Sequence, residues 1–358
     1  MKNSMNLKAV GAIMALALIS FAGCSDDKAK AKGNAMAEAV DTIATSVAHE
    51  FIDATFAKAE PVVEKIRPTR DVTDFDGIND LLVFDSVMYA VYDGGVVIFD
   101  FAVGEPVFIE TGEAFNAVAR FDNQVYVGGT RLYTVADNSL IPVDAKFEGV
   151  INELYPYGFI LAIGTDCGLY SRSYVGDMTV TTDFAVVRMA ADDDGLWVAT
   201  DGQGLYRWNG EEFSRRYLYR DTTIFDKVRA LDFNRGYLYV GTDDGFFIYN
   251  GGSWRQLTAE DGLPSDWVMD IDASDWVILI GTNNGVTTYF NGEFRPVGNM
   301  ENIPATAVER FGRRVLAGTG DRGILIKSGT QVKTLVNPQK TKEAPIAHNP
   351  ETIQFGGE

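Results

Sequence analysis

The segment Gly281-Thr282-Asn283-Asn284-Gly285 joins two apolar runs, residues 276–280 before it and 286–290 after it. The same pattern of an apolar run, Gly-Thr, two polar residues, Gly and a second apolar run recurs along the chain in exact or degenerate copies. Its Thr, or the Tyr that replaces it in the first copy, stands at positions 92, 130, 165, 200, 242, 282 and 319, so that successive copies are 38, 35, 35, 42, 40 and 37 residues apart. A period near 40 with several short strands per unit is typical of β-propellers. The sequence therefore predicts an all-β fold, a seven-bladed β-propeller of four-stranded blades over residues 72–336.

The sixth copy shows the expected strands of a blade. Strand a is predicted over residues 265–271, strand b over 276–282, strand c over 285–290 and strand d over 292–297. Asn-Gly pairs at 209–210, 250–251 and 291–292 recur between strands c and d, and such pairs are strong hairpin signals. Turn residues at equivalent offsets support the repeat more strongly than apolar runs alone.

Part of this repeat resembles a known family. Residues 261–268 (Asp-Gly-Leu-Pro-Ser-Asp-Trp-Val), followed by residues 281–286, are similar to the two-component-regulator propeller repeat, and residues 196–200 fit it as well. That repeat is found in periplasmic sensor regions of bacterial hybrid histidine kinases and in free-standing secreted proteins. The resemblance covers residues 72–336 and is strongest in blades four to six. It implies the fold well and the function poorly, and we expect no kinase or regulator part in this chain.

The N-terminus has the pattern of a secretion signal. Lys2 and Lys8 precede an apolar run over residues 9–19, which is too short to span a bilayer, and Ala22-Gly23-Cys24 follows. This ending resembles the bacterial lipobox, which implies that residues 1–23 are a lipoprotein signal peptide and that Cys24 carries the lipid. An ordinary signal peptide is the alternative. Ser25 after the cysteine favours an outer-membrane lipoprotein facing the periplasm or the cell surface, and inner-membrane anchoring stays open.

Three further segments are predicted outside the propeller. Residues 24–33 are expected to form a flexible leader, residues 34–67 an amphipathic helix with a linker, and residues 337–358 a disordered tail. The helix is predicted from one apolar stripe at helical spacing, which comprises Met36, Val40, Ile43, Val47, Phe51 and Ala54. The stripe has three interpretations: packing on the propeller, insertion into a partner's groove, or self-association of two copies.

Charge and cysteine content restrict the partners. The chain has a net charge of −19, nearly all of it in residues 71–336, which disfavours nucleic acid as a partner. Cys167 is the only cysteine besides Cys24, so lipidation would leave it without a disulfide partner. Its predicted place in a strand b–c turn, with no histidine in the propeller region, makes a nucleophilic role a poor interpretation. No cofactor is predicted.

A ligand-binding rim is predicted at one mouth of the central channel, where the starts of strands a and the b–c turns meet. The aligned starts of strand a are Asn79, Asn116, Asn152, Ala185, Asp226, Asp266 and Thr306, and the b–c turns add Asp93, Asp166, Asp201, Asp243, Asp244, Asn283, Asn284 and Asp321. Such carboxylates and amides suit a cation, glycan hydroxyl groups or a basic protein loop. The alternative is structural, because Asn and Asp in such positions cap their own turns.

A second candidate surface lies in the longer link between blades four and five. It is a local basic and aromatic patch in an acidic chain, made of Arg215, Arg216, Tyr217, Tyr219 and Arg220. Partner contact and a simple surface link are both consistent with it. Asp192-Asp193-Asp194 looks metal-like but falls at a predicted a–b turn and lacks the further ligands of a calcium loop, so no metal site is predicted.

These features predict a lipid-anchored, non-catalytic propeller that binds a protein or glycan partner at the bacterial cell envelope. An accessory ligand-sensing component for a separate membrane kinase is one alternative. A polysaccharide hydrolase or lyase that uses rim carboxylates is another, because paired acids can carry out such chemistry. The remaining enzyme motifs, including phosphate loops and paired metal-binding histidines, are missing from the sequence.

Overall fold

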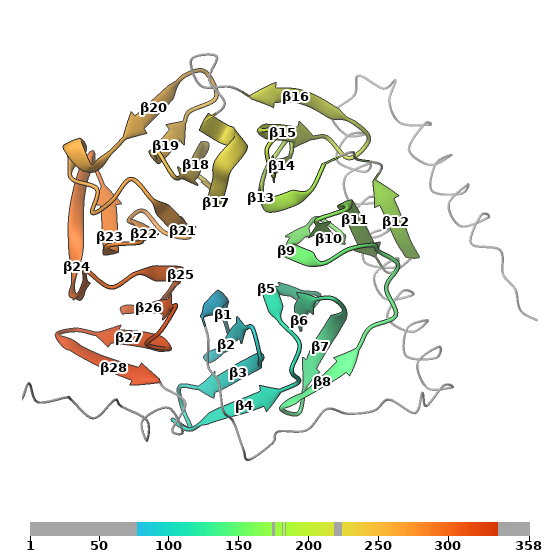
Figure 1. Cartoon of the computed structure of the whole chain (residues 1–358), viewed down its shortest axis with the longest axis horizontal. Helices are drawn as coiled ribbons and strands as arrows, with labels where there is room; N and C mark the ends of the chain where they lie inside the picture. The colour runs from blue at the N-terminus through green and yellow to red at the C-terminus, as the bar shows by residue number, and fades with distance from the viewer. Residues whose placement is uncertain (1–76, 174–175, 181, 183, 218–223, 336–358) are drawn as a thin grey trace, which may run out of the picture. The chain divides into compact units, whose positions relative to one another are not determined.

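The computed structural model describes residues 77–173, 176–180, 182, 184–217 and 224–335. In this part of the chain, 28 strands form seven four-stranded sheets, each built from four consecutive strands in sequential antiparallel order. The sheets stand around a central axis as blades, with the first strand of each blade innermost (Figure 1). The predicted all-β seven-bladed propeller is therefore confirmed.

Each blade has four short strands, of four to nine residues. Blades one to four comprise β1 (Ile78–Phe84), β2 (Val87–Tyr92), β3 (Gly95–Asp100) and β4 (Pro106–Glu110); β5 (Phe115–Phe121), β6 (Gln124–Gly129), β7 (Leu132–Ala136) and β8 (Ser139–Pro142); β9 (Ile151–Tyr157), β10 (Ile160–Thr165), β11 (Gly168–Ser173) and β12 (Gly176–Val180); β13 (Val186–Asp192), β14 (Gly195–Thr200), β15 (Leu205–Trp208) and β16 (Phe213–Tyr217). Blades five to seven comprise β17 (Val228–Asn234), β18 (Tyr237–Thr242), β19 (Gly245–Tyr249) and β20 (Trp254–Leu257); β21 (Val268–Asp272), β22 (Ile278–Thr282), β23 (Gly285–Phe290) and β24 (Glu293–Glu301); β25 (Ala305–Phe311), β26 (Arg314–Thr319), β27 (Ile324–Ser328) and β28 (Gln331–Leu335). Two short 3₁₀ helices, η1 (Ile224–Lys227) and η2 (Ala259–Asp261), precede β17 and β21.

The glycine of the Gly-Thr pattern is required by contact between blades. A Cβ on Gly241 would lie 2.5 Å from a methyl group of Val268, and one on Gly164 would lie 2.6 Å from Val186. Val268 and Val186 each begin the innermost strand of the next blade. Glycine thus lets neighbouring blades approach closely, which is one of the roles of glycine in strands. Equivalent glycines are Gly128, Gly281 and Gly318.

The threonine of the pattern holds the turn between strands b and c. Thr282 is fully buried, donates a hydrogen bond from its hydroxyl to the Gly285 carbonyl (2.8 Å) and accepts one from the Asn284 amide (3.2 Å). Thr165 and Thr242 make the same pair of bonds. In blade two the residue at this position is Gly129 rather than Thr130, because Gly129 is paired with Phe115 as Thr165 is with Ile151. In blade two the position equivalent to the threonine is therefore 129, one residue earlier than the sequence pattern indicates.

The ring is closed by contacts between blades seven and one, without exchange of a strand among the described residues. The Thr306 hydroxyl donates a hydrogen bond to the Ile78 carbonyl (2.5 Å), and the Gly77 amide donates one to the Gly320 carbonyl (3.2 Å). Ile78, Leu81 and Met88 of blade one share a buried cluster with residues of blade seven. A Cβ on Gly318 would lie 2.4 Å from Ile78, so this junction is as tight as the others.

The antiparallel meander gives the ring two distinct ends. We call the end with the b–c turns and the links between blades the b–c face, and the end with the a–b and c–d hairpins the a–b face. Among the described residues, no helix has the length and apolar character needed to cross a membrane. Cys24, the predicted helix at 34–67 and the predicted tail at 337–358 lie outside the described residues.

Candidate functional site

Four of the side chains predicted to line the rim on the b–c face bind the next blade instead. The side-chain amides of Asn79, Asn116 and Asn152 donate to the carbonyls of Phe115, Ile151 and Val186, at 2.9, 2.9 and 3.0 Å. Each acceptor is the first residue of the next innermost strand, and Thr306 makes the equivalent bond across the ring junction. These bonds join successive blades, so the donors are already used within the fold.

The predicted column of rim residues has a different register in blades four to six. Asn79 is the second residue of its innermost strand. The residues at the equivalent position in blades four, five and six, as the strand pairing shows, are Val187, Arg229 and Met269. Asp266 lies two residues before β21, where its carboxylate accepts a hydrogen bond from the Ala259 amide at 2.7 Å. The structure gives no description of the Asp226 side chain.

Some polar side chains of the b–c turns are bonded within the fold, and others are exposed. Asp93 accepts from the Asn79 side chain at 2.8 Å, and Asp166 accepts from the Val150 amide at 2.7 Å. Asp243 forms an ion pair with Arg229. Asp201, Asn283 and Asp321 are exposed at the b–c face, and Asp321 lies 3.8 Å from the Arg322 guanidinium. Turn capping therefore accounts for part of the predicted rim.

The innermost strands carry a group of acids that the sequence prediction missed. Two residues after the start of the innermost strand stand Asp80, Glu153, Arg188 and Asp270, and two residues further along stand Asp232, Asp272 and Glu309. Arg188 is the only cation among these seven side chains, and it lies 3.8 Å from Glu153. Alternate positions along six of the innermost strands thus place six carboxyl groups and one guanidinium near the axis of the ring.

Several of these carboxylates accept hydrogen bonds from backbone amides at the open edge of the neighbouring innermost strand. Asp80 accepts from the Val118 amide at 2.8 Å, and Asp270 accepts from the Val308 amide at 2.6 Å. Asp232 accepts from the Ala273 amide at 2.7 Å. An innermost strand has no further strand beside it, so its outward amides need other acceptors. The acids of the axis are therefore part of the blade-to-blade structure.

Burial of these acids shifts their titration. Burial raises the pKa of Asp80 and of Asp232 to about 6 and that of Asp270 to about 7, while the backbone hydrogen bonds they accept act in the opposite direction. Burial also raises the pKa of Glu153 and of Glu309 well above the usual range. Repulsion by neighbouring carboxylates adds to the effect of burial at Asp232, Asp270, Glu153 and Glu309, as expected for acids that share one region.

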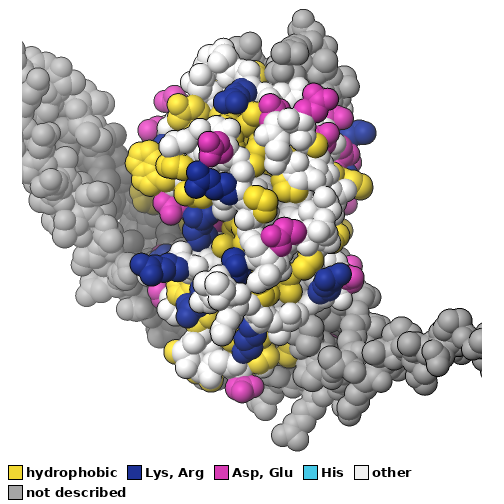
Figure 2. Space-filling view, turned by 90° about the vertical axis from the view of Figure 1, so that its left-hand side faces the viewer, with side chains coloured by type: hydrophobic (Ala, Val, Ile, Leu, Met, Phe, Trp, Pro, Cys, Tyr) yellow, Lys and Arg dark blue, Asp and Glu magenta, His cyan; other side chains and the backbone are white. Residues whose placement is uncertain are grey.

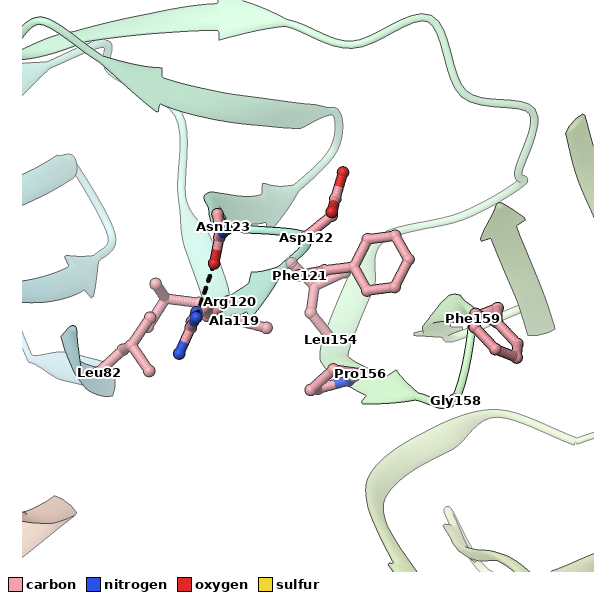
Figure 3. A pocket seen from close by; sticks show the side chains of 11 residues that line it. Leu82, Ala119, Arg120, Phe121, Asp122, Asn123, Leu154, Pro156, Gly158 and Phe159 are labelled. Atoms are coloured by element: carbon pink, nitrogen blue, oxygen red, sulfur yellow. Dashed lines mark hydrogen bonds between the residues drawn. The ribbon is translucent and has the colours of Figure 1, made fainter. Parts of the chain in front are cut away.

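A pocket of about 630 Å³ opens on the a–b face between the innermost strands of blades one, two and three. Its apolar lining comes from Leu82, Phe121, Leu154 and Pro156, and its polar lining from the hairpin between β5 and β6 (Figure 3). The Arg120 guanidinium donates to the Asn123 side-chain oxygen at 2.7 Å and stacks over the Phe84 ring at 4.1 Å. The lining combines apolar side chains with a few fixed polar groups, as ligand sites do, and the pocket is wide open to solvent.

Phe159 stands at the border of this pocket with 85% of its surface exposed. It occupies the turn between β9 and β10, directly after Gly158, which has a positive φ of 57°. The exposed ring points away from the blade beside Gly158 (Figure 3). An exposed aromatic ring next to arginine and amide groups suits a ligand with both apolar and hydrogen-bonding surfaces.

Phe159 belongs to a wider difference between the two ends of the ring. Of the six exposed large apolar side chains in the described part of the chain, Trp267 alone lies on the b–c face. The other five lie at hairpins of the a–b face and are Val103, Phe159, Tyr237, Trp276 and Phe290. Arg235 stacks over Trp276 at 3.4 Å. Hairpin turns normally contain Gly, Asn or Asp. Aromatic and apolar residues at such turns are the sequence signal that could have predicted the exposed apolar side chains of the a–b face.

The other singled-out residues have structural partners or lie outside the description. Asp192 accepts from the Asp194 amide (2.9 Å) and from the Trp197 indole (2.9 Å), as a turn residue does. Cys167 is exposed and unpaired; desolvation and then the Asp166 carboxylate raise the pKa of its thiol, which disfavours the reactive thiolate. Over the described residues, no group of three or more His, Cys, Asp and Glu side chains is arranged to hold a metal ion. The patch at Arg215, Arg216, Tyr217, Tyr219 and Arg220 has no described side chains.

Comparison with known proteins supports the fold. No protein-family profile matches the chain, and no curated protein sequence matches it. Among solved structures, the WD40 β-propeller domain of Doa1 has a TM-score of 0.58 at 14% identity, over 74% of this chain and 97% of that one. The extracellular domain of a proposed hybrid two component system from B. thetaiotaomicron has a TM-score of 0.60 at 14% identity, over 80% of this chain and 42% of that one.

A second bacterial structure is similar in the same way. The extracellular domain of a proposed one component system from B. thetaiotaomicron has a TM-score of 0.55 at 17% identity, over 74% of this chain and 40% of that one. This chain thus matches about two-fifths of each of these two extracellular domains. At such low identity the likeness shows the β-propeller fold, which hosts many unrelated functions.

Proposed function

We propose that this chain is a non-catalytic β-propeller that binds a protein or glycan partner at the bacterial cell envelope, where a lipid on Cys24 anchors it. The observation that carries the binding role is the a–b face, with a pocket of about 630 Å³ and the exposed Phe159 beside it. The predicted anchor rests on the sequence of residues 1–25 alone. The mass of the mature N-terminal peptide tests it, because lipidation adds acyl chains to Cys24.

The a–b face supports binding better than the predicted rim does. On the b–c face, the amides of Asn79, Asn116 and Asn152 and the carboxylates of Asp93 and Asp166 are bonded within the fold. A ligand at that face would have to compete with these bonds. On the a–b face the large apolar side chains contact solvent, and aromatic and arginine side chains are enriched in the energetically important centres of interfaces.

Two of the sequence-based alternatives differ in the support they have. The ligand-sensing alternative gains from the similarity to extracellular domains of proposed bacterial signalling systems, although that similarity is one of fold. The hydrolase or lyase alternative requires carboxylates free to react. Asp80, Asp232 and Asp270 instead accept backbone hydrogen bonds between blades, which favours a structural role for them.

The test of the proposed function is recovery of a partner from native envelopes by crosslinking. The wild-type chain is compared with Phe159→Ala and with Phe290→Ala, which removes an exposed aromatic ring from the same face outside the pocket. We expect Phe159→Ala to lose the partner and Phe290→Ala to keep it. The same three proteins are screened against envelope glycans by calorimetry. Equal recovery and equal glycan binding by all three proteins would contradict the pocket as the binding site.

A further inference from the structure

Blade seven has the opposite charge from the rest of the propeller. Residues 78–304 contain 34 acidic and 14 basic side chains, whereas residues 305–335, which form blade seven, contain two acidic and six basic ones. The six are Arg310, Arg313, Arg314, Arg322, Lys327 and Lys333. Figure 2 looks onto the side of the ring with blades six and seven, where dark-blue and magenta side chains both lie at the surface.

Most cations of blade seven have no anionic partner. Arg313, Arg314, Lys327 and Lys333 form no ion pair with any side chain in the described part of the chain, and we call these four the blade-seven patch. Cations of other blades do form such pairs, as Arg207 does with Asp192 and Arg229 with Asp243. The positive charge of the patch is therefore available to an external anion.

Two of these cations, Arg314 and Lys333, form cation–π contacts with aromatic rings. The Arg314 guanidinium lies 4.9 Å from the centre of the Phe101 ring and 5.5 Å from that of Phe311, and the Lys333 ammonium lies 5.2 Å from the centre of the Phe99 ring. Cation–π contacts of this kind orient a charged group without neutralising it. Arg314 and Lys333 thus present ordered charge at the junction of blades seven and one. Lys327 is paired with Val315 and Val332 and stands on the other face of the sheet, toward blade six.

The chemistry of the patch favours a lipid surface over a protein partner. None of the six exposed large apolar residues of the described part of the chain belongs to blade seven. Protein interfaces usually have a buried apolar or aromatic centre, and lysine is depleted in them. Several Lys and Arg side chains on one surface without such a centre are typical of binding to anionic lipid headgroups.

We propose that the blade-seven patch docks on an anionic lipid surface and so orients the tethered propeller. This rests on the part of the proposed function that places a lipid on Cys24. A lipid on Cys24 keeps the propeller near the bilayer but does not by itself set which side of the ring faces the lipid. An anionic lipid surface repels the net negative charge of blades one to six. The lipid anchor is therefore needed to hold the chain at the surface, and the blade-seven patch is needed to orient blade seven toward it. Screening limits this attraction to within about 10 Å at moderate salt.

The test uses lysine labelling of the mature chain on vesicles. The chain from residue 24 onward, with Cys167→Ser, is coupled through the Cys24 thiol to a maleimide lipid in phosphatidylcholine vesicles with or without phosphatidylglycerol. An amine-reactive ester then labels the lysines. Lys327 and Lys333 report on the patch, while the exposed Lys146 and Lys227 at the b–c face serve as internal controls. We expect phosphatidylglycerol to reduce labelling of the patch lysines roughly fivefold, since each basic residue near such a surface contributes about 1 kcal/mol.

A matched pair of charge reversals locates the effect. Arg313→Glu with Arg314→Glu should abolish the protection of Lys327 and Lys333. Arg255→Glu with Arg295→Glu changes net charge equally at exposed positions of blades five and six and should preserve it. Equal labelling on both vesicle types would overturn the proposal, as would equal loss of protection in both double variants. Protection found only on native envelopes would assign the patch to a protein and would also overturn it. The maleimide lipid is attached to Cys24 in vitro, so the result does not depend on whether the cell lipidates Cys24.

Discussion

The two faces of this propeller use polar and aromatic residues in opposite ways. On the b–c face, Asn, Asp and Thr side chains are bonded to turns and to neighbouring blades, so residues that resemble a ligand rim hold the ring together. On the a–b face, Phe159, Tyr237 and Trp276 contact solvent, and Phe159 does so beside a pocket. Stability should therefore depend on the b–c face and binding on the a–b face.

The largest expected effect is at the ring junction of the b–c face. Gly318→Val places a branched side chain where even a Cβ would lie 2.4 Å from Ile78, and overpacking of this kind costs about 3 kcal/mol or more. The control is Gly320→Ala, two residues away, where a Cβ would meet nothing within 4 Å. Urea unfolding should show a large loss for Gly318→Val and almost none for Gly320→Ala. Equal midpoints for both variants would mean that the junction tolerates expansion.

The next effect is the pH dependence that the buried carboxyls impose. Burial raises the pKa of Asp80 and Asp232 to about 6 and that of Asp270 to about 7 in the folded state, above the values of an unfolded chain. The folded state therefore holds extra protons, and the stability these groups contribute at low pH is lost as pH rises through 6 and 7. Between pH 5.5 and 7.5 we expect the free energy of unfolding to fall by about 2–4 kcal/mol.

Asp270→Asn tests the assignment of that pH dependence. Asparagine keeps an oxygen that can accept from the Val308 amide but has no proton to lose, so the slope of stability against pH should become shallower. Thermal unfolding at a series of pH values from 5.5 to 7.5 measures both proteins. An unchanged slope in Asp270→Asn would assign the titration to other groups.

A smaller effect separates bonded from free members of the predicted rim. Asn116→Ala removes the 2.9 Å hydrogen bond to the Ile151 carbonyl and should cost about 1 kcal/mol of unfolding free energy. Asn283→Ala changes an exposed side chain of the same predicted rim that has no hydrogen bond to another blade. It should therefore be neutral in urea unfolding. Comparable losses in both variants would argue that the two asparagines have the same role.

The fold was predictable from the sequence because its repeat has a physical cause in every blade. Glycine at the end of strand b is required by close contact with the next blade, and threonine after it holds the turn, so both recur at fixed spacing. Three blades depart from this pattern: Gly129 takes the threonine position in blade two, and the glycine position is taken by Ala199 in blade four and by Val91 in blade one. Blade one shows the limit of the pattern, because the buried Tyr92 fills the threonine position instead.

The candidate site was less predictable because side-chain partners depend on contacts between blades. Asn79 and Asp266 looked equivalent in sequence, yet one donates to the next blade and the other accepts from the loop before its own blade. The acids near the axis were missed because Asp80 and Asp270 stand inside strands whose apolar neighbours dominate the pattern. Phe159 could have been noticed in the sequence, because it is an aromatic residue directly after glycine in a hairpin turn. The repeat pattern that predicts the fold does not involve this position.

The smallest expected effect on stability is at the pocket of the a–b face. Phe159→Ala removes a ring that is 85% exposed, so its free energy of unfolding should change by no more than about 0.5 kcal/mol. The same substitution is expected to abolish partner recovery, whereas Asn116→Ala should lower stability and leave recovery intact. Paired measurements of unfolding and partner capture on these two variants therefore test whether stability and binding are separated between the two faces. A Phe159→Ala protein that unfolds more easily and still captures its partner would show that the ring is structural and that binding lies elsewhere.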